Sequence, residues 1–190
     1  MRGSFVKLGI IIEAALFICV MPTNSTTMVE LTLKEMCCKS SHIVIARTTS
    51  VNSYLAPDRN RIYTEITLEI VNSIKGQLQP GNILRLNLYG GTVNGITTIV
   101  VGAPTFTVGE LSLLFLSGGK SAQSGKSHFT VYGLSQGKFN IYVDGKEKRV
   151  LRDNIELPIL LEKNGEYLPL TSTQSIPLEE FLNLIEDYLR

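Results

Sequence analysis

The chain has 190 residues, of which 44% are hydrophobic and 18% are charged, and its 18 Lys and Arg residues face 17 Asp and Glu. This length and apolar content suffice for one folded domain and exclude wholesale disorder. A formal net charge of +1 lacks the positive excess that nucleic-acid-binding proteins use. We therefore expect neither nucleic acid nor an anionic lipid surface as the partner.

The first 25 residues are organised like a secretory signal peptide. Arg2 and Lys7 supply positive charge, an apolar stretch follows over residues 8–21, and cleavage is expected after Ser25. The stretch is shorter than the roughly 20 residues that span a bilayer. We predict a signal peptide over residues 1–25 and a periplasmic or secreted location. Because Glu13 interrupts the stretch, a leader that is retained as a membrane anchor stays open as the alternative.

A short helix is predicted after the leader. Thr32, with Glu35 three positions later, forms a capping-box pattern that starts a helix over about residues 33–41. Cys37 shares the apolar face of this helix, so we interpret Cys37 as a small core residue and Cys38 as its flanking neighbour. Adjacent cysteines rarely form a disulfide. With two histidines in the chain and no metal-site spacing, neither a metal nor a cofactor is expected.

From His42 to about Leu170 the pattern is typical of one β-strand after another. In the segment Arg61–Ile74, apolar residues alternate with polar ones, which predicts a strand with one buried and one exposed face. The unbroken apolar run Leu111–Leu116 instead predicts a strand that is buried on both faces. Three dipeptides indicate hairpins with type I′ turns. The predicted strands are His42–Ser53, Arg61–Ile74, Asn82–Leu88 and Leu111–Leu116, then shorter ones around Phe129 and Phe139, and the dipeptides are Asn94-Gly95, Asp144-Gly145 and Asn164-Gly165.

A second helix is predicted at the C-terminus. Ser175 is expected to cap it, Pro177 is expected in its first turn, and an apolar stripe should lie against the sheet. The stripe consists of Leu178, Phe181, Leu182, Ile185 and Leu189. Helices are missing between the strands, which excludes βαβ units. The predicted fold is mainly β: a single domain over residues 30–190, built as a small closed barrel or sandwich with one helix at each end.

The chain contains a series of glycine turns and strand signatures that follow one another in a fixed order. The set is His42–Val51, Ile62–Thr64, Ile74–Gly76, Gly90-Gly91, Gly102–Pro104, Gly109-Glu110 and Gly133–Phe139, followed by the amphipathic helix. Over about residues 30–188 it resembles a group of uncharacterised bacterial exported proteins, some of which look like companions of matrixin-type metalloproteases. The resemblance implies an extracytoplasmic location and a barrel loosely similar to the OB-fold. It carries no established activity and no catalytic residue.

One motif suggests catalysis. Gly133–Gly137 matches G-x-S-x-G, with Ser135 at the position of the nucleophile of α/β-hydrolases. Strand patterns flank the motif on both sides, whereas a nucleophile elbow leads into a helix, and no histidine follows Ser135 in the triad order. We interpret the segment as a glycine-rich connection between strands. A serine hydrolase that uses Ser135 with His128 as its base is kept as the alternative function.

The leading functional prediction is an exported, non-enzymatic binding or accessory module. Its partner is expected to be a protein or another component of the cell envelope. Binding surfaces of such folds usually lie on loops. The candidate segments are Ser53–Asn60, Tyr89–Val93 and Ser117–Ser127, and the sequence does not rank them.

Overall fold

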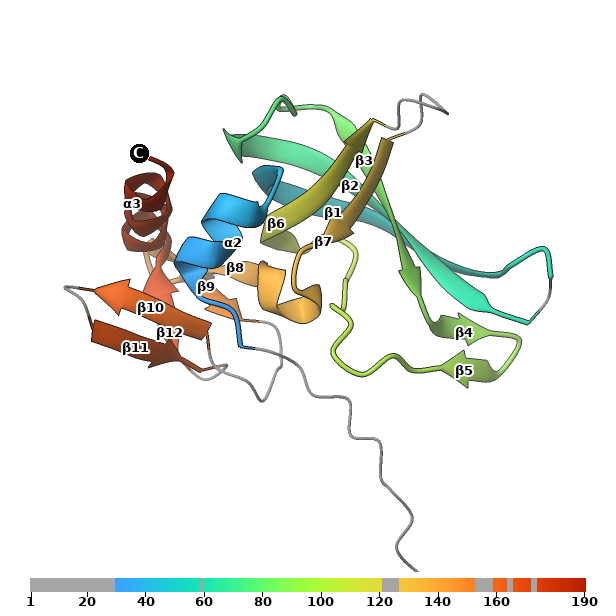
Figure 1. Ribbon diagram of the computed structural model, residues 1–190. Helices are drawn as coiled ribbons and strands as arrows, with labels where there is room; N and C mark the ends of the chain where they lie inside the picture. Colours follow the sequence, from blue (N-terminus) through green and yellow to red (C-terminus); the bar gives the residue numbers. More distant parts are fainter. Residues whose placement is uncertain (1–29, 59, 121–126, 153–158, 164–165, 172–173) are drawn as a thin grey trace, which may run out of the picture.

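The computed structural model describes residues 30–58, 60–120, 127–152, 159–163, 166–171 and 174–190 (Figure 1). The fold is mainly β, with a large mixed sheet and a small helix near each end of the described chain. The predicted signal peptide over residues 1–25 lies outside this range. Within this range, no helix has both the length and the apolar character needed to cross a membrane.

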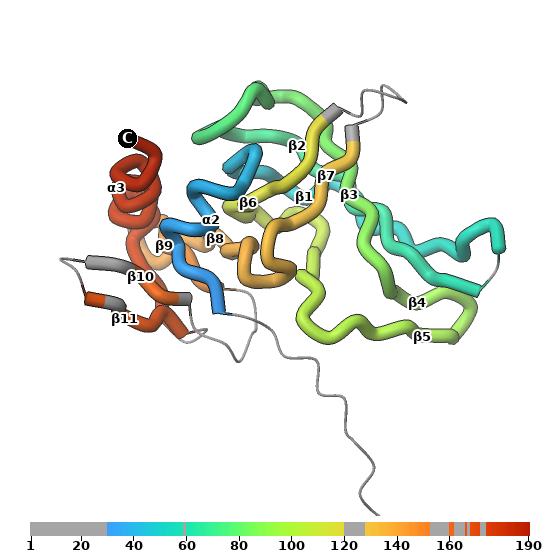
Figure 2. The backbone as a smooth tube through the Cα atoms, viewed as in Figure 1, coloured from blue at the N-terminus to red at the C-terminus, as the bar shows by residue number. Residues whose placement is uncertain are grey.

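The path of the chain is followed most easily in Figure 2. The early elements are α2 (Leu33–Lys39), β1 (His42–Leu55), β2 (Ile62–Lys75), β3 (Ile83–Tyr89), β4 (Gly91–Val93), β5 (Ile96–Thr98), β6 (Leu111–Lys120) and β7 (Ser127–Val131). The later ones are the 3-10 helix η1 (Leu134–Gly137), β8 (Lys138–Asp144), β9 (Glu147–Arg152), β10 (Ile159–Lys163), β11 (Glu166–Leu170), β12 (Ser175–Pro177) and α3 (Leu178–Leu189).

The large sheet has the strand order β1-β2-β3-β7-β6-β8-β9-β12, and β1 also pairs with β6. All neighbours are antiparallel except β3 and β7, which run parallel where Leu86 lies opposite Phe129. The pairs β4–β5 and β10–β11 form two separate small sheets. In both ribbon and tube views, β4 and β5 lie on the opposite side of the molecule from α3 (Figures 1 and 2).

The hydrophobic core consists of two clusters that lie on opposite faces of β1 and β6. Ile43 and Ile45 of β1 join the cluster that contains both helices. Val44 and Ala46, which alternate with them, join a second cluster whose buried members all come from β1, β2, β3, β6 and β7. Alternate residues of Leu111–Leu116 divide between the clusters in the same way. The prediction that this segment is buried on both faces is confirmed.

The N-terminal helix has the predicted cap. The hydroxyl oxygen of Thr32 accepts a hydrogen bond from the Glu35 N–H at 3.0 Å, and Cys37 is fully buried as expected. At the other end, Lys75 of β2 donates to the carbonyl oxygens of Cys37 (2.7 Å) and Cys38 (3.2 Å). A cation at this position satisfies carbonyls that the helix leaves unpaired. The helix therefore ends at Lys39, two residues before its predicted end.

Two segments predicted to be loops are partly strand. Ser53, Tyr54 and Leu55 continue β1, because each lies opposite a residue at the start of β2. The connection is thus shorter than the predicted Ser53–Asn60. Likewise, β6 continues through Lys120 and β7 begins at Ser127, so both ends of the predicted loop Ser117–Ser127 are strand. Residues 121–126 lie outside the described range.

Of the three predicted hairpin turns, the one at Asn94-Gly95 is confirmed. Asn94 and Gly95 join β4 to β5 with φ angles of 52° and 78°, as a type I′ turn requires. The β8–β9 turn is centred on Gly145 and Lys146 because Asp144 pairs with Glu147. The prediction of Asp144-Gly145 as its centre is therefore wrong by one residue. Residues 164–165 lie outside the described range, although the flanking strands β10 and β11 pair antiparallel.

The C-terminal helix presents its predicted apolar stripe to the core. Leu178, Phe181 and Ile185 are buried, and Leu182 and Leu189 pack against the same cluster. The predicted cap is wrong. Ser175 lies in β12, its hydroxyl and carbonyl oxygens accept hydrogen bonds from Arg149 (both 2.9 Å), and Pro177 takes the N-cap position. Pairing with β9 therefore displaces the helix start beyond Ser175.

Candidate functional site

The three segments predicted to bind a partner lie at opposite ends of β1 and β2. Ser53–Asn60 and Tyr89–Val93 come together at one end, because the start of β2 pairs with both the end of β1 and the end of β3. The described part of Ser117–Ser127 lies at the other end, where Gly119 borders a pocket. The structure thus brings two of the three predicted binding segments close together.

Three tyrosines form a row across the strands at the first end. Tyr63 of β2 lies directly opposite Tyr54 of β1 and Tyr89 of β3. The ring centroids are 6.1 Å apart for Tyr54 and Tyr63, and 5.5 Å apart for Tyr63 and Tyr89. Tyr54 remains 41% exposed and Tyr89 48% exposed. We call these three residues the tyrosine row.

The next cross-strand row on the same face is polar. Glu65 of β2 lies opposite Asn52 and Asn87. Residues two apart in a strand share a face, so these groups lie beside the tyrosine rings. A hydrogen bond from the Tyr54 hydroxyl to Oδ1 of Asn87, at 3.5 Å, links the two rows. The face thus places aromatic rings next to amide and carboxylate groups.

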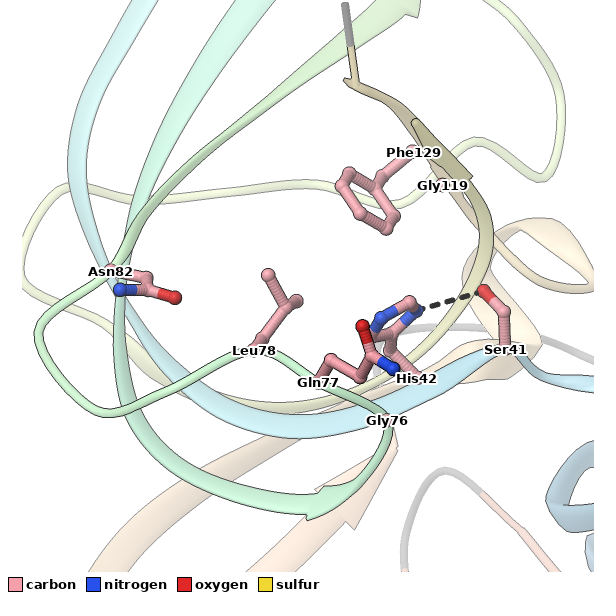
Figure 3. A pocket seen from close by; sticks show the side chains of 8 residues that line it. All are labelled: Ser41, His42, Gly76, Gln77, Leu78, Asn82, Gly119 and Phe129. Atoms are coloured by element: carbon pink, nitrogen blue, oxygen red, sulfur yellow. Dashed lines mark hydrogen bonds between the residues drawn. The ribbon is translucent and has the colours of Figure 1, made fainter. Parts of the chain in front are cut away.

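The opposite end carries a pocket of about 670 Å³ (Figure 3). Its volume falls within the range of about 300–1,000 Å³ that is usual for ligand sites. Phe129, Leu78 and His42 line it, and Asn82 lies across from His42 in this view. The His42 and Phe129 rings pack in an edge-to-face arrangement, with centroids 5.1 Å apart and planes at 90°. Apolar contact therefore covers part of this imidazole, which is half-buried.

His42 has a defined tautomer. Its Nδ1 lies 3.0 Å from the Ser41 hydroxyl oxygen, and that hydroxyl faces the carbonyl oxygens of Leu116 (3.1 Å) and Gly118 (2.7 Å). The single hydroxyl hydrogen of Ser41 points toward these carbonyl oxygens. The Ser41 oxygen is therefore the acceptor in its hydrogen bond with His42, and Nδ1–H is the donor. The neutral ring then carries its lone pair on Nε2. Burial lowers the pKa of His42 below its ordinary value of 6.5, which favours this neutral form.

Ser135 and His128 are not brought together by a hydrogen bond. Ser135 lies in η1 and is 2% exposed, and its Oγ has no hydrogen-bond partner among the described residues. Its N–H donates to the carbonyl of Gly102 at 3.0 Å. His128 is exposed on β7. A nucleophile needs access to substrate and a base within hydrogen-bond reach, so this geometry does not favour the hydrolase alternative, which stays a prediction.

The cysteines do not form a chemical site with each other. Cys37 is buried and Cys38 is exposed, and both are free. Burial, followed by the neighbouring Cys38, raises the pKa of Cys37 to about 12, so its thiol stays protonated at neutral pH. Among the described residues, no cluster of three His, Cys, Asp or Glu side chains could hold a metal ion.

The tyrosine row is the feature that sequence reasoning missed. Tyr54 and Tyr89 fall in two predicted binding segments and Tyr63 in a predicted strand, but their common position depends on the pairing of three strands. The Arg61–Ile74 alternation already predicts that Tyr63 lies on the face away from Ile62. The sequence gives no comparable signal for its partners.

Comparison with known proteins adds no family assignment. Neither a scan of protein-family models nor a search of curated proteins found a match to this chain.

Proposed function

We propose that the protein is an extracytoplasmic, non-enzymatic module that binds a component of the cell envelope through the tyrosine row. The observation that carries the proposal is the meeting of Tyr54, Tyr63 and Tyr89 on one exposed sheet face. Contiguous exposed aromatic surface is uncommon away from binding sites. Tyrosine is also favoured at such sites because it offers a large apolar ring with a polar tip.

We further infer that β1, β2, β3, β7 and β6 form a small closed barrel of OB-like topology. The ring of pairings that returns from β6 to β1, together with the parallel step between β3 and β7, supports this inference. So does the second core cluster, whose buried members come from these five strands alone. Such a barrel would hold the tyrosine row on a rigid outer surface, which lowers the entropic cost of binding.

The compartment is proposed from the leader pattern and from the resemblance to exported bacterial proteins. Arg2, Lys7 and the apolar stretch 8–21 support export. In that compartment the accessible partners are envelope polymers and exported proteins, and a binding module would act by holding one of them.

The test is cross-linking of the native protein in its own cell fraction. A photoreactive phenylalanine derivative replaces Tyr89 in one variant and the comparably exposed Tyr142 of β8 in the control. We expect a recurrent adduct from position 89, little adduct from position 142, and an N-terminus that begins near residue 26. Equal yields at both positions would refute the tyrosine row as the binding surface, and an untrimmed N-terminus would refute cleavage.

A further inference from the structure

The rings of the tyrosine row lie next to one another across three strands. Tyr54 and Tyr63 have nearly parallel planes, at 26°, whereas Tyr89 is tilted by 60° from Tyr63. The side chains come from three hydrogen-bonded strands, so the backbone fixes their spacing. The partly exposed rings of Tyr54 and Tyr89 offer apolar surface to a ligand.

The polar row beside it has free hydrogen-bonding groups. The Asn52 amide donates to Ser50 Oγ at 2.7 Å, and Asn87 accepts from Tyr54. Oδ1 of Asn52, Nδ2 of Asn87 and the Glu65 carboxylate are left without a hydrogen-bond partner among the described residues. The row therefore offers both donors and acceptors to a ligand lying on the tyrosine rings. A hydroxyl group satisfies either kind, since it donates and accepts.

The charges on this face balance. Arg47 and Arg85 are matched by Glu65 and Glu69 on the outer side of the same three strands. Near the hairpin tip, Arg61 forms an ion pair with Asp58 at 2.8 Å. A polyanion needs an excess of cationic side chains, and the described residues of this face show none. Charge complementarity thus favours an uncharged ligand.

We propose that the tyrosine row binds an uncharged oligosaccharide chain, an inference that rests on the proposed function and specifies its ligand. The C–H faces of successive pyranose rings lie on the tyrosine rings, as nucleic-acid bases do on aromatic side chains in other proteins. Their hydroxyl groups exchange hydrogen bonds with Asn52, Glu65 and Asn87. No covalent step is involved.

The experiment is calorimetric titration of the purified mature chain with uncharged β-1,4-linked oligosaccharides of N-acetylglucosamine and of glucose. The variants are Tyr54→Ala/Tyr89→Ala, the conservative Tyr54→Phe, and Tyr142→Ala as the matched control from outside the face. Tyr54, Tyr89 and Tyr142 are all exposed, so the variants should fold, and thermal unfolding verifies this before titration.

We expect wild-type binding to one of these series. The double variant should bind at least about tenfold more weakly, a change of about 1.4 kcal/mol, while Tyr142→Ala binds like wild type and Tyr54→Phe stays within a few-fold. Affinity should change little between about 0.05 and 0.5 M salt, because an uncharged ligand is not subject to screening. Binding that is unaffected in the double variant, or no binding to either series, overturns the proposal.

A parallel retention assay separates this proposal from the proposed function. Immobilised protein is exposed to the envelope fraction before and after exhaustive protease treatment. Retention that depends on Tyr54 and Tyr89 and survives proteolysis supports the saccharide. Tyrosine-dependent retention that proteolysis abolishes refutes the saccharide while the binding module stands, and retention that is indifferent to these tyrosines refutes both.

Discussion

Lys138 at the start of β8 is fully buried, and its Nζ lies 2.7 Å from Oε1 of Glu110, just before β6. Ser112 donates to the same carboxylate oxygen at 3.0 Å, and Lys138 also bonds to Oδ1 of Asn140. The ring of Phe106 lies 5.1 Å from Nζ. The ion pair thus joins the segment just before β6 to the start of β8.

Removing one member of this ion pair should cost more than removing both. Glu110→Ala leaves the buried Lys138 ammonium without its counter-charge, and we expect it to lower the free energy of unfolding by about 3–5 kcal/mol. Glu110→Ala/Lys138→Met should recover much of this loss. Urea unfolding of the three proteins measures the difference. A double variant that is as unstable as Glu110→Ala would refute this account of the pair.

Only one of the two helix cysteines should react with a thiol reagent in the folded state. Cys38 is exposed, whereas Cys37 is buried with its pKa raised to about 12, and the thiolate is the reactive form. Alkylation with iodoacetamide at pH 8, followed by peptide mapping, should find Cys38 modified and Cys37 intact. Denatured protein provides the control, in which both react. Equal modification of both residues in the native protein would contradict the assignment.

The partly buried imidazole of His42 should make stability depend on pH. Because burial lowers its pKa below 6.5, the unfolded chain takes up the proton first, so stability is retained above about pH 6.5 and declines as the pH falls through the lower, folded-state pKa. We expect wild type to lose more free energy of unfolding between pH 7.5 and 5 than His42→Phe, which keeps a ring against Phe129. Parallel pH profiles of the two proteins would show that His42 does not contribute.

Ser135 should be dispensable for stability and should not react with serine-directed reagents. Its Oγ is buried without a hydrogen-bond partner among the described residues, and an unsatisfied buried hydroxyl carries a desolvation cost of about 1–3 kcal/mol. Ser135→Ala should therefore unfold at equal or higher free energy. A fluorophosphonate probe should label neither protein. Labelling of wild type that Ser135→Ala abolishes would revive the hydrolase alternative.

Local patterns predicted the elements well where a single segment determines them. The cap at Thr32, the doubly buried run Leu111–Leu116 and the Asn94-Gly95 turn depend on neighbouring residues, and all three are confirmed. Ser175 failed as a cap because a partner far along the chain, Arg149, engages it. Predictions were therefore wrong where pairing with a distant strand overrode local preference.

The buried charged side chains and the tyrosine row could not be predicted from local sequence patterns, because they too depend on distant segments. Nothing near Lys138 marks it as buried, since its partner Glu110 lies far away in the sequence, just before β6. Arg152 is similar: burial lowers its pKa to about 10, and its guanidinium donates to the carbonyl of Leu170. The tyrosine row likewise exists only after three strands have paired in one register.

The most direct test of the tyrosine row as a binding surface is nuclear magnetic resonance of the protein with isotope-labelled tyrosine rings. Titration with solubilised envelope material should shift or broaden the ring signals of Tyr54, Tyr63 and Tyr89, while Tyr142 stays unchanged. This readout does not depend on the chemical class of the ligand. If the three signals stay fixed, or if Tyr142 shifts equally, the account of this face as the binding surface is contradicted.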